Sequence, residues 1–363
     1  MALATKRQSS ELTEGARKRA VKVTTTYIVL AVLLVVTALW SAAAGQFDAT
    51  FGQTLRALGN LLFGGGAETA DTSRIELVLW EVRLPRIALA AIVGSGLAVA
   101  GVALQAVFGN PLAEPGLIGV SSGAAVGAAA VTVLGTTTAI TAAAGEWAVA
   151  LGAFFGGIAA TAVVAATAKG GRDVARIILV GVAVNAVCGG LVSLFTYIAT
   201  PAARDRIVFW QMGSFAAADW TQVGLVLLAT VPSAAVLWML AGKLDLLSLG
   251  ETQARHLGVD VPKLRRVVIT VAALVVAVGV AFSGIIVFIG LVVPHALRLT
   301  MGPAHRHLVP AALLGGAVAT TIADLAARTL IVGADLPLGM LTALVGGPLF
   351  FWLLIRGNRA VKA

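Results

Sequence analysis

The chain has 363 residues, of which 59% are apolar and only 12% are charged. Soluble proteins carry roughly 25% charged residues, so this chain has too little polar surface to cover a water-facing body of its size, and a soluble globular enzyme is excluded. A single cysteine, Cys188, excludes a disulfide framework and a thiolate metal cluster. The net charge of +9 would suit nucleic acid only if the basic residues formed one continuous face, and they are scattered instead.

Stretches without Asp, Glu, Lys or Arg recur at about the ~20 residues that a helix needs to cross a bilayer. Nine qualify or nearly do: residues 27–47, 87–113, 115–145, 147–168, 177–203, 220–242, 267–297, 308–323 and 336–355. The stretch 267–297 is interrupted by Ser283 and Gly284 and closes at Pro294 and His295, so we interpret it as two short crossings. The sequence therefore predicts an all-α polytopic membrane protein with ten transmembrane helices.

The basic residues set the expected orientation, because cytoplasmic loops retain Lys and Arg. With ten crossings and both termini in the cytoplasm, most of the 26 basic residues lie on the inner side. The predicted organisation is a basic cytoplasmic N-terminal segment (1–26), a ten-helix domain (27–356) and a cytoplasmic tail (357–363). Residues 27–44 also resemble a signal peptide, but its removal would leave nine spans and place the remaining loop charge on the wrong side.

Small residues recur at helix-packing spacings in two of the predicted spans. Gly119, Gly123 and Gly127 follow one another at every fourth residue, as do Gly152 and Gly156. Such spacing lets helix backbones approach closely in lipid, where no hydrophobic effect drives helices together. It predicts a compact bundle and does not indicate a binding site.

Motifs for catalysis and for resident cofactors are missing from the sequence. No G-x-x-x-x-G-K-[ST] motif occurs, so the chain is not expected to hydrolyse nucleotide. Of the four histidines, only His305 and His307 are close in sequence, and a solvated loop explains them better than a metal site. No nucleophile with a base can be assembled, so we expect no catalytic residue, no metal and no cofactor in this chain.

Titratable residues are also scarce inside the predicted spans. Asp324 lies toward the outer end of its span and Glu114 lies in a turn, while the deep polar groups are the neutral Gln105, Asn110 and Asn185. Ion-coupled transporters place titratable side chains near the bilayer midplane. The composition therefore favours a transport pathway driven by energy from other subunits over one driven by an ion relay.

Two loop segments carry more information than the spans. Residues 244–266 form a cytoplasmic loop in which Gly250 and Gly258 bracket a short helix-prone stretch. Ala254 and Leu257 share one helical face there, and Glu251, Arg255 and His256 offer polar contacts. The stretch suits a groove on a cytosolic partner, and from physical reasoning alone a solvated connector fits equally well.

The second segment is the proline-rich turn at 109–123. Pro111 and Pro115, with Asn110 before the first, must break the helix at the cytoplasmic end of the second span. Broken backbone at membrane depth is tolerated only against protein or a water-filled cavity. We therefore expect this turn to border the pathway or a partner, and its motif residues are Asn110, Pro111, Glu114, Pro115 and Gly119.

At these residues the sequence resembles the FecCD-type permeases of ABC importers for iron-siderophores, haem and cobalamin, from about residue 27 to 356. The resemblance rests on RLPR at 83–86, NPLAEPGLIGVSSGA at 110–124 and GETQARHLG at 250–258, followed by FIGLVVPHALRL at 288–299 and LPLGMLTALVGGPLFFWLL at 336–354. It implies a type II importer fold of ten helices in the cytoplasmic membrane. It also implies a second copy of the chain, two ATP-binding subunits that hold ATP and magnesium, and a substrate-binding protein outside.

The resemblance assigns expected roles to named residues. The ATPase-coupling residues are Gly250, Glu251, Ala254, Arg255, Leu257 and Gly258. The residues expected to dock the binding protein are Arg83, Arg86 and Arg328, which the charge pattern already places on the outer side. Arginines at these positions are also explained by side chains that extend from the helix ends to the membrane interface. Val174 and Ala175 lie where the family places its gate, although family members often have small hydroxyl residues at these positions. Asn185 lies on the same helix, and it could either line the pathway or form an interhelical hydrogen bond.

The expected function is ATP-driven alternating access that brings a bulky chelate into the cell. The 110–124 motif is most similar to that of the haem and cobalamin members, whereas siderophore permeases commonly have a different residue before the second proline. We expect haem as the cargo, with cobalamin and ferric siderophores as the alternatives. Two other classes stay open, an ion-coupled secondary transporter and a non-transporting membrane scaffold. Uptake by the purified chain alone would favour the first, and co-purification with an ATPase would count against the second.

Overall fold

The computed structural model describes residues 2–44, 50–64, 70–135, 139–167, 174–331 and 333–360, and these residues form helices joined by turns. The elements are α1 (Ala2–Ala43), α2 (Phe51–Phe63), α3 (Ala70–Val78), a π-helical turn (Leu79–Arg83), α4 (Leu84–Val107), a 3-10 turn (Pro115–Ile118), α5 (Val120–Leu134), α6 (Ala139–Thr167), α7 (Val174–Ile198), α8 (Pro201–Met212), α9 (Trp220–Met239), α10 (Ala241–Leu247), α11 (Glu251–His256), α12 (Val261–Ser283), α13 (Ile289–Met301), α14 (His305–Thr329) and α15 (Leu338–Ala360).

Seven helices among the described residues are long and apolar enough to cross a bilayer: Ala20–Ala43, Asp71–Val107, Gly145–Thr167, Val174–Ile198, Trp220–Met239, Val261–Ser283 and His305–Thr329. Three shorter apolar helices accompany them, namely Val120–Leu134, Ile289–Met301 and Leu338–Trp352. The all-helical, multi-pass prediction is confirmed. The division into ten crossings and the sidedness of the termini stay predictions.

The predicted pair of short crossings at 267–297 needs correction. The chain does break after Ser283, where Gly284 has a φ of 68°, and the helix resumes at Ile289. However, α12 is a full span of 23 residues, and Pro294 lies inside α13 instead of closing it. The stretch 267–297 therefore contains most of the long helix α12 and the larger part of the short helix α13.

Helix α4 lies at the centre of the bundle and packs against α9, α12, α13 and α14. Glycines allow its closest contacts: a Cβ on Gly101 would lie 1.8 Å from the carbonyl oxygen of Gly290. The predicted small-residue packing is confirmed between α5 and α6, where Gly127 faces Gly152 and Gly123 faces Gly156 at similar distances. These contacts build a tight bundle without large side chains.

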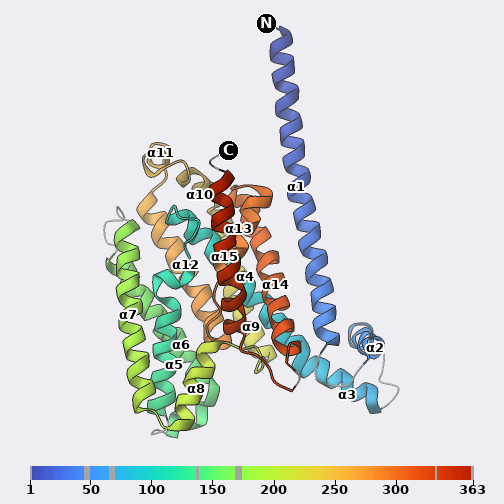
Figure 1. The fold of residues 1–363 in the computed structure, drawn as a ribbon, viewed down its shortest axis with the longest axis vertical. Coiled ribbons are helices and arrows are strands. Elements are labelled where there is room, and N and C mark those ends of the chain that lie inside the picture. The colour runs from blue at the N-terminus through green and yellow to red at the C-terminus, as the bar shows by residue number, and fades with distance from the viewer. Residues whose placement is uncertain are drawn as a thin grey trace.

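The two ends of the bundle carry different elements (Figure 1). α11 lies at the end where α1 begins and α15 finishes, and α2, α3 and α8 lie at the opposite end. α7 runs along one edge of the bundle, far from α1. The helix-prone loop segment and the three predicted docking arginines therefore belong to opposite ends of the molecule.

Candidate functional site

The predicted coupling stretch forms a separate short helix, α11. Gly250 (φ 112°) and Gly258 (φ 83°) flank it in left-handed backbone that other residues rarely adopt. The helix of residues 251–256 thereby turns sharply out of α10 and into α12. The sequence prediction of a glycine-bracketed helix is confirmed.

An ion-pair cluster fastens α11 to the bundle. The Glu251 carboxylate pairs with Arg265 on α12, whose side chain is buried, and lies 3.4 Å from the Arg255 guanidinium. Sequence reasoning missed Arg265, although its place in the basic run 263–266 was a signal. Glu251 thus links α11 to the membrane-spanning helix α12.

The faces of α11 differ from the expectation in one respect. Ala254 is fully buried against the chain's own core, so it does not share an exposed face with Leu257. Leu257 is 58% exposed, and the neighbouring Leu249, which the sequence analysis did not single out, is 62% exposed. The apolar surface open to a partner is therefore formed by these two leucines, because the short helix must use its alanine for internal packing.

The proline-rich turn between α4 and α5 is a junction of four helices. Asn110 closes the turn by accepting a hydrogen bond from the Leu112 N–H at 2.9 Å. Glu114 accepts one from the Phe288 N–H at 3.0 Å, at the N-terminus of α13. Burial raises the pKa of the Glu114 carboxyl, and the hydrogen bond from Phe288 opposes this. The turn thus fixes where α13 begins.

The same turn is tied to the predicted pathway helix α7. Asn185 Nδ2 donates to the Gly116 carbonyl at 3.2 Å, and Asn185 Oδ1 accepts from the Ser122 hydroxyl. This geometry corresponds to the interhelical alternative for Asn185, and a role in the pathway stays a prediction. Pro115 packs beside Gly290 of α13, and Gly119 (φ 78°) leads from the turn into α5.

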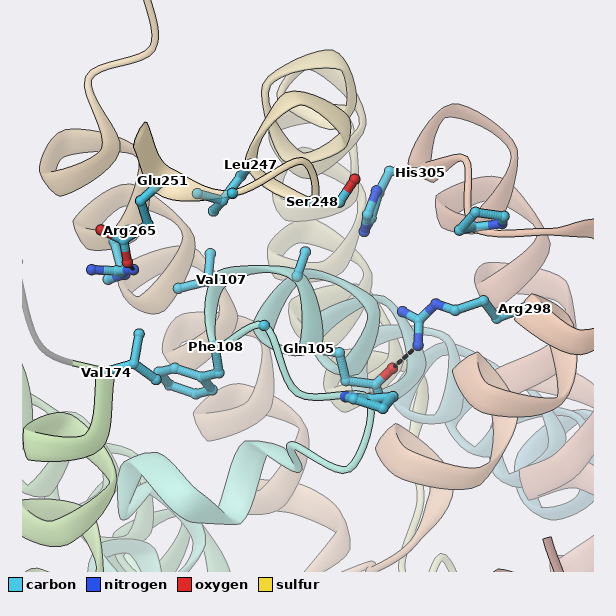
Figure 2. Close-up of a pocket in the computed structure, with 15 residues that line it drawn as sticks. Gln105, Val107, Phe108, Val174, Leu247, Ser248, Glu251, Arg265, Arg298 and His305 are labelled. Atoms are coloured by element: carbon cyan, nitrogen blue, oxygen red, sulfur yellow. Dashed lines mark hydrogen bonds and ion pairs between the residues drawn. The ribbon is translucent and has the colours of Figure 1, made fainter. Parts of the chain in front are cut away.

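The predicted gate residues lie at the first turn of α7, where Val174 and Ala175 begin the helix. Val174 lines a cavity of about 420 Å³ at this end of the bundle, together with Phe108, Pro111 and Leu247 (Figure 2). Glu251 and Arg265 of the coupling cluster line the same cavity. The gate and the coupling helix are therefore neighbours, while a gating role itself stays a prediction.

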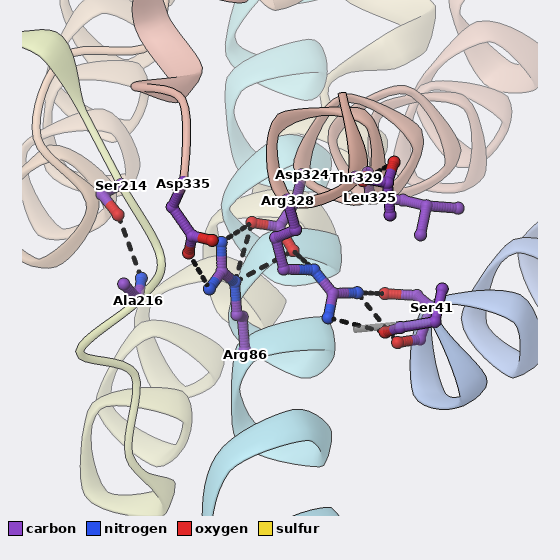
Figure 3. Close-up of polar contacts among 10 residues, drawn as sticks. Ser41, Arg86, Ser214, Ala216, Asp324, Leu325, Arg328, Thr329 and Asp335 are labelled. Carbon is purple, nitrogen blue, oxygen red and sulfur yellow. Dashed lines mark hydrogen bonds and ion pairs between the residues drawn. The ribbon is translucent and has the colours of Figure 1, made fainter. Parts of the chain in front are cut away.

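Two of the three predicted docking arginines, Arg86 and Arg328, form ion pairs inside the protein (Figure 3). Arg86 pairs with Asp324 of α14 at 3.0 Å and with Asp335 of the α14–α15 loop at 2.7 Å. Arg328 Nε lies 3.4 Å from Asp324 Oδ2, and its Nη2 donates to the Ser41 carbonyl of α1 at 2.8 Å. These contacts join α1, α4 and α14 near their shared end.

Their burial limits what these arginines present to a partner. Arg83, Arg86 and Arg328 are 6%, 9% and 8% exposed, and Arg83 donates to the Ala43 carbonyl at 3.2 Å. Docking to a binding protein stays a prediction for them. Sequence reasoning missed the network because it read each charge singly, although the i, i+4 spacing of Asp324 and Arg328 was an available signal.

A larger cavity, of about 890 Å³, opens at the end of the bundle opposite α11. It lies between α5, α6, α8 and the end of α12, and its walls include Glu146, Trp147, Arg206, Trp210 and Phe282. Among the described residues, no group of three or more His, Cys, Asp or Glu could hold a metal ion.

Comparisons with known proteins agree with this geometry. The FecCD transport family matches residues 33–356. The hemin transport system permease HmuU of Yersinia pestis is 38% identical over 328 residues, which cover 90% of this chain and 94% of that protein. The vitamin B12 import system permease BtuC of Shigella sonnei is 40% identical over 290 residues, covering 79% and 86%.

A solved structure is similar along almost the whole chain. It is described as an inward-facing conformation of a metal-chelate type ABC transporter, and it superposes with a TM-score of 0.79 at 34% identity. The match covers 91% of this chain and 98% of the solved one. The chain therefore belongs to the FecCD transport family, the membrane-spanning permeases of ABC importers.

Proposed function

We propose that this chain is the permease of an importer that brings haem into the cytoplasm. The observation that carries the proposal is the similarity to the hemin permease, which extends over 90% of this chain and 94% of its relative. The similarity to the vitamin B12 permease is as high in identity but covers less of both chains. Cobalamin and ferric siderophores are the alternatives within the family.

The working unit in this proposal is a two-fold dimer with ten crossings per chain and both termini inside. The seven long spans and the three shorter apolar helices would together make the ten crossings. Two of the long apolar stretches are mostly exposed, since 17% of that in α7 and 11% of that in Ala20–Ala43 is buried, against 78% of that in Asp71–Val107. The resemblance to the family selects α7 of these two as the helix that would meet a second copy and line the pathway between them.

Two ATP-binding subunits would dock at the α11 end and a substrate-binding protein at the opposite end. Leu249 and Leu257 offer the apolar contact for a groove on the ATPase, and the Glu251–Arg265 pair would carry its motion into α12. ATP and magnesium would be held by those subunits. Alternating access then follows from the different affinities of the partners for the two conformations.

The coupling role is tested with Glu251→Lys in the complex reconstituted in proteoliposomes. The change sets a second cation against Arg265, so we expect α11 to detach and both haem uptake and its stimulation of ATP hydrolysis to fall. Asp71→Lys, an exposed charge reversal on α3 that lines neither cavity, is the matched control. Uptake and stimulation that both survive Glu251→Lys would remove the coupling assignment.

The cargo is tested by competition in the same proteoliposomes, loaded with the binding protein encoded beside this chain. Radiolabelled haem should accumulate with ATP, and unlabelled haem should compete while cobalamin and ferric siderophores should not. Accumulation of cobalamin instead would keep the permease assignment and replace the cargo.

A further inference from the structure

The charged side chains around the 420 Å³ cavity are not balanced. Among the described residues that line it, Glu251 is the only carboxylate, and it is held by Arg265 and Arg255. Arg298 of α13 reaches the cavity from the other side, next to His305 (Figure 2). The cavity therefore contains one guanidinium more than its own carboxylates can pair.

Arg298 differs from the other buried arginines in its partner. Arg86 and Arg328 share Asp324, Arg265 pairs with Glu251, and Arg83 donates to backbone carbonyls. Arg298 Nη1 donates to the neutral Gln105 Oε1 at 2.9 Å, and in the described part of the chain no carboxylate lies within ion-pair distance of it. A half-buried cation is costly unless an anion pairs with it.

His305 supplies a second polar group on the same side. Its side chain is 5% exposed, and its Nδ1 lies 2.7 Å from Asp245 Oδ1, which also accepts from the His305 backbone N–H at 2.8 Å. The buried Nε2 has no hydrogen-bond partner among the described residues, and His305 is one of the residues that line the cavity.

We infer that this cavity is a binding site for a phosphate group, held by the Arg298 guanidinium. Gln105 fixes the guanidinium from below, since its own Nε2 donates to the Gly290 carbonyl at 3.4 Å. Arginine suits phosphate because its planar fork forms two parallel charge-assisted hydrogen bonds. An inorganic phosphate ion or the headgroup phosphate of a phospholipid in the adjacent leaflet would each supply this chemistry.

An occupied site would contact residues from three segments of the chain. Arg298 lies on α13, His305 begins α14, and Ser248 of the α10–α11 connection lines the same space. A phosphate between them would brace the segment that carries α11. This inference holds for any cargo, so its test is independent of the haem assignment.

The test uses the full chain, purified in detergent, stripped of lipid and given sodium phosphate against sodium chloride at equal ionic strength. Phosphate should raise the melting temperature and bind with a measurable affinity in calorimetry. Arg298→Gln should weaken that affinity about tenfold or more, because it removes a charge-assisted contact. Arg298→Lys should retain part of it, and Arg306→Gln, an exposed neighbour with the same loss of charge, should retain all of it.

Native mass spectrometry then separates the two sources of phosphate. An adduct of phosphate mass that depends on Arg298 assigns the free ion, and a phosphatidylglycerol adduct with the same dependence assigns the lipid headgroup. The inference is overturned if phosphate and chloride stabilise the native chain equally, or if Arg306→Gln weakens binding as much as Arg298→Gln. It is also overturned if the isolated chain binds neither probe and Arg298→Gln affects only assembly with the ATPase, because an acidic side chain of that subunit would then be the anion.

Discussion

At the scale of single residues, the charges inside this bundle hold helices together. Arg86 joins α4 to α14 and to the loop before α15, and Arg328 joins α14 to α1. Removing one partner of a buried ion pair is costly because the other charge stays buried without compensation. The three arginines expected at the outer surface therefore have a structural role that precedes any role in docking.

Asp324→Asn tests this structural role. The carboxylate is 1% exposed and serves both Arg86 and Arg328, so its loss should lower the free energy of unfolding by about 3–5 kcal/mol. Thermal unfolding in detergent measures the change. Asp205→Asn, an exposed carboxylate on α8 at the same end, should be nearly neutral, and equal stability of the two variants would contradict the network's role.

Glu114→Ala tests the junction at the proline-rich turn. The substitution leaves the Phe288 N–H at the start of α13 without its acceptor, and an unsatisfied buried donor costs about 1–3 kcal/mol. Glu114→Gln keeps an acceptor oxygen and should recover most of the loss in chemical unfolding. If Gln and Ala destabilise equally, the negative charge matters more than the hydrogen bond.

At the scale of whole helices, apolar runs and glycine spacing predicted where helices lie, whereas most of the helix pairs that pack together could not be predicted from them. The predicted spans at 177–203 and 220–242 correspond to α7 and α9, and the glycine repeats did mark the α5–α6 contact. The sequence did predict a break near Ser283 and a short helix after it, but it did not predict that α12 would be a full span, because Lys263, Arg265 and Arg266 lie inside this helix and outside the uncharged stretch. The burial of Ala254 was not predicted either, because a six-residue helix has no strong periodicity.

Gly101→Ala tests the closest helix contact of the core. A Cβ at this position would lie 1.8 Å from the Gly290 carbonyl oxygen, so α4 and α13 must separate, and overpacking of this kind costs about 1–3 kcal/mol. We expect a lower melting temperature and reduced transport. Gly189→Ala on α7, where a Cβ meets open space, is the control, and a Gly101→Ala variant as stable as Gly189→Ala would show that the contact is not tight.

At the scale of the molecule, the family and the multi-pass character follow from motifs and composition that are local in sequence. The arrangement of the site does not follow from local sequence, because it depends on pairs of residues that lie far apart in the chain. Glu251 with Arg265 and Gln105 with Arg298 meet at one end, and Arg86 with Asp324 meets at the other. The charged side chains that make these contacts thus lie near the two ends of the bundle.

This distribution predicts that the chain does not work as an ion-coupled carrier. A proton or sodium relay needs titratable groups that change charge along the pathway, whereas Asp324 is held between Arg86 and Arg328 and the exposed surface of α7 is largely apolar. Proteoliposomes that contain the purified chain alone should therefore show no haem accumulation under an imposed pH or sodium gradient. Adding the two ATP-binding subunits, the binding protein and ATP should restore accumulation at the same protein density. Gradient-driven uptake by the chain alone would contradict the argument, because the charges that link its helices would then have to move with the cargo.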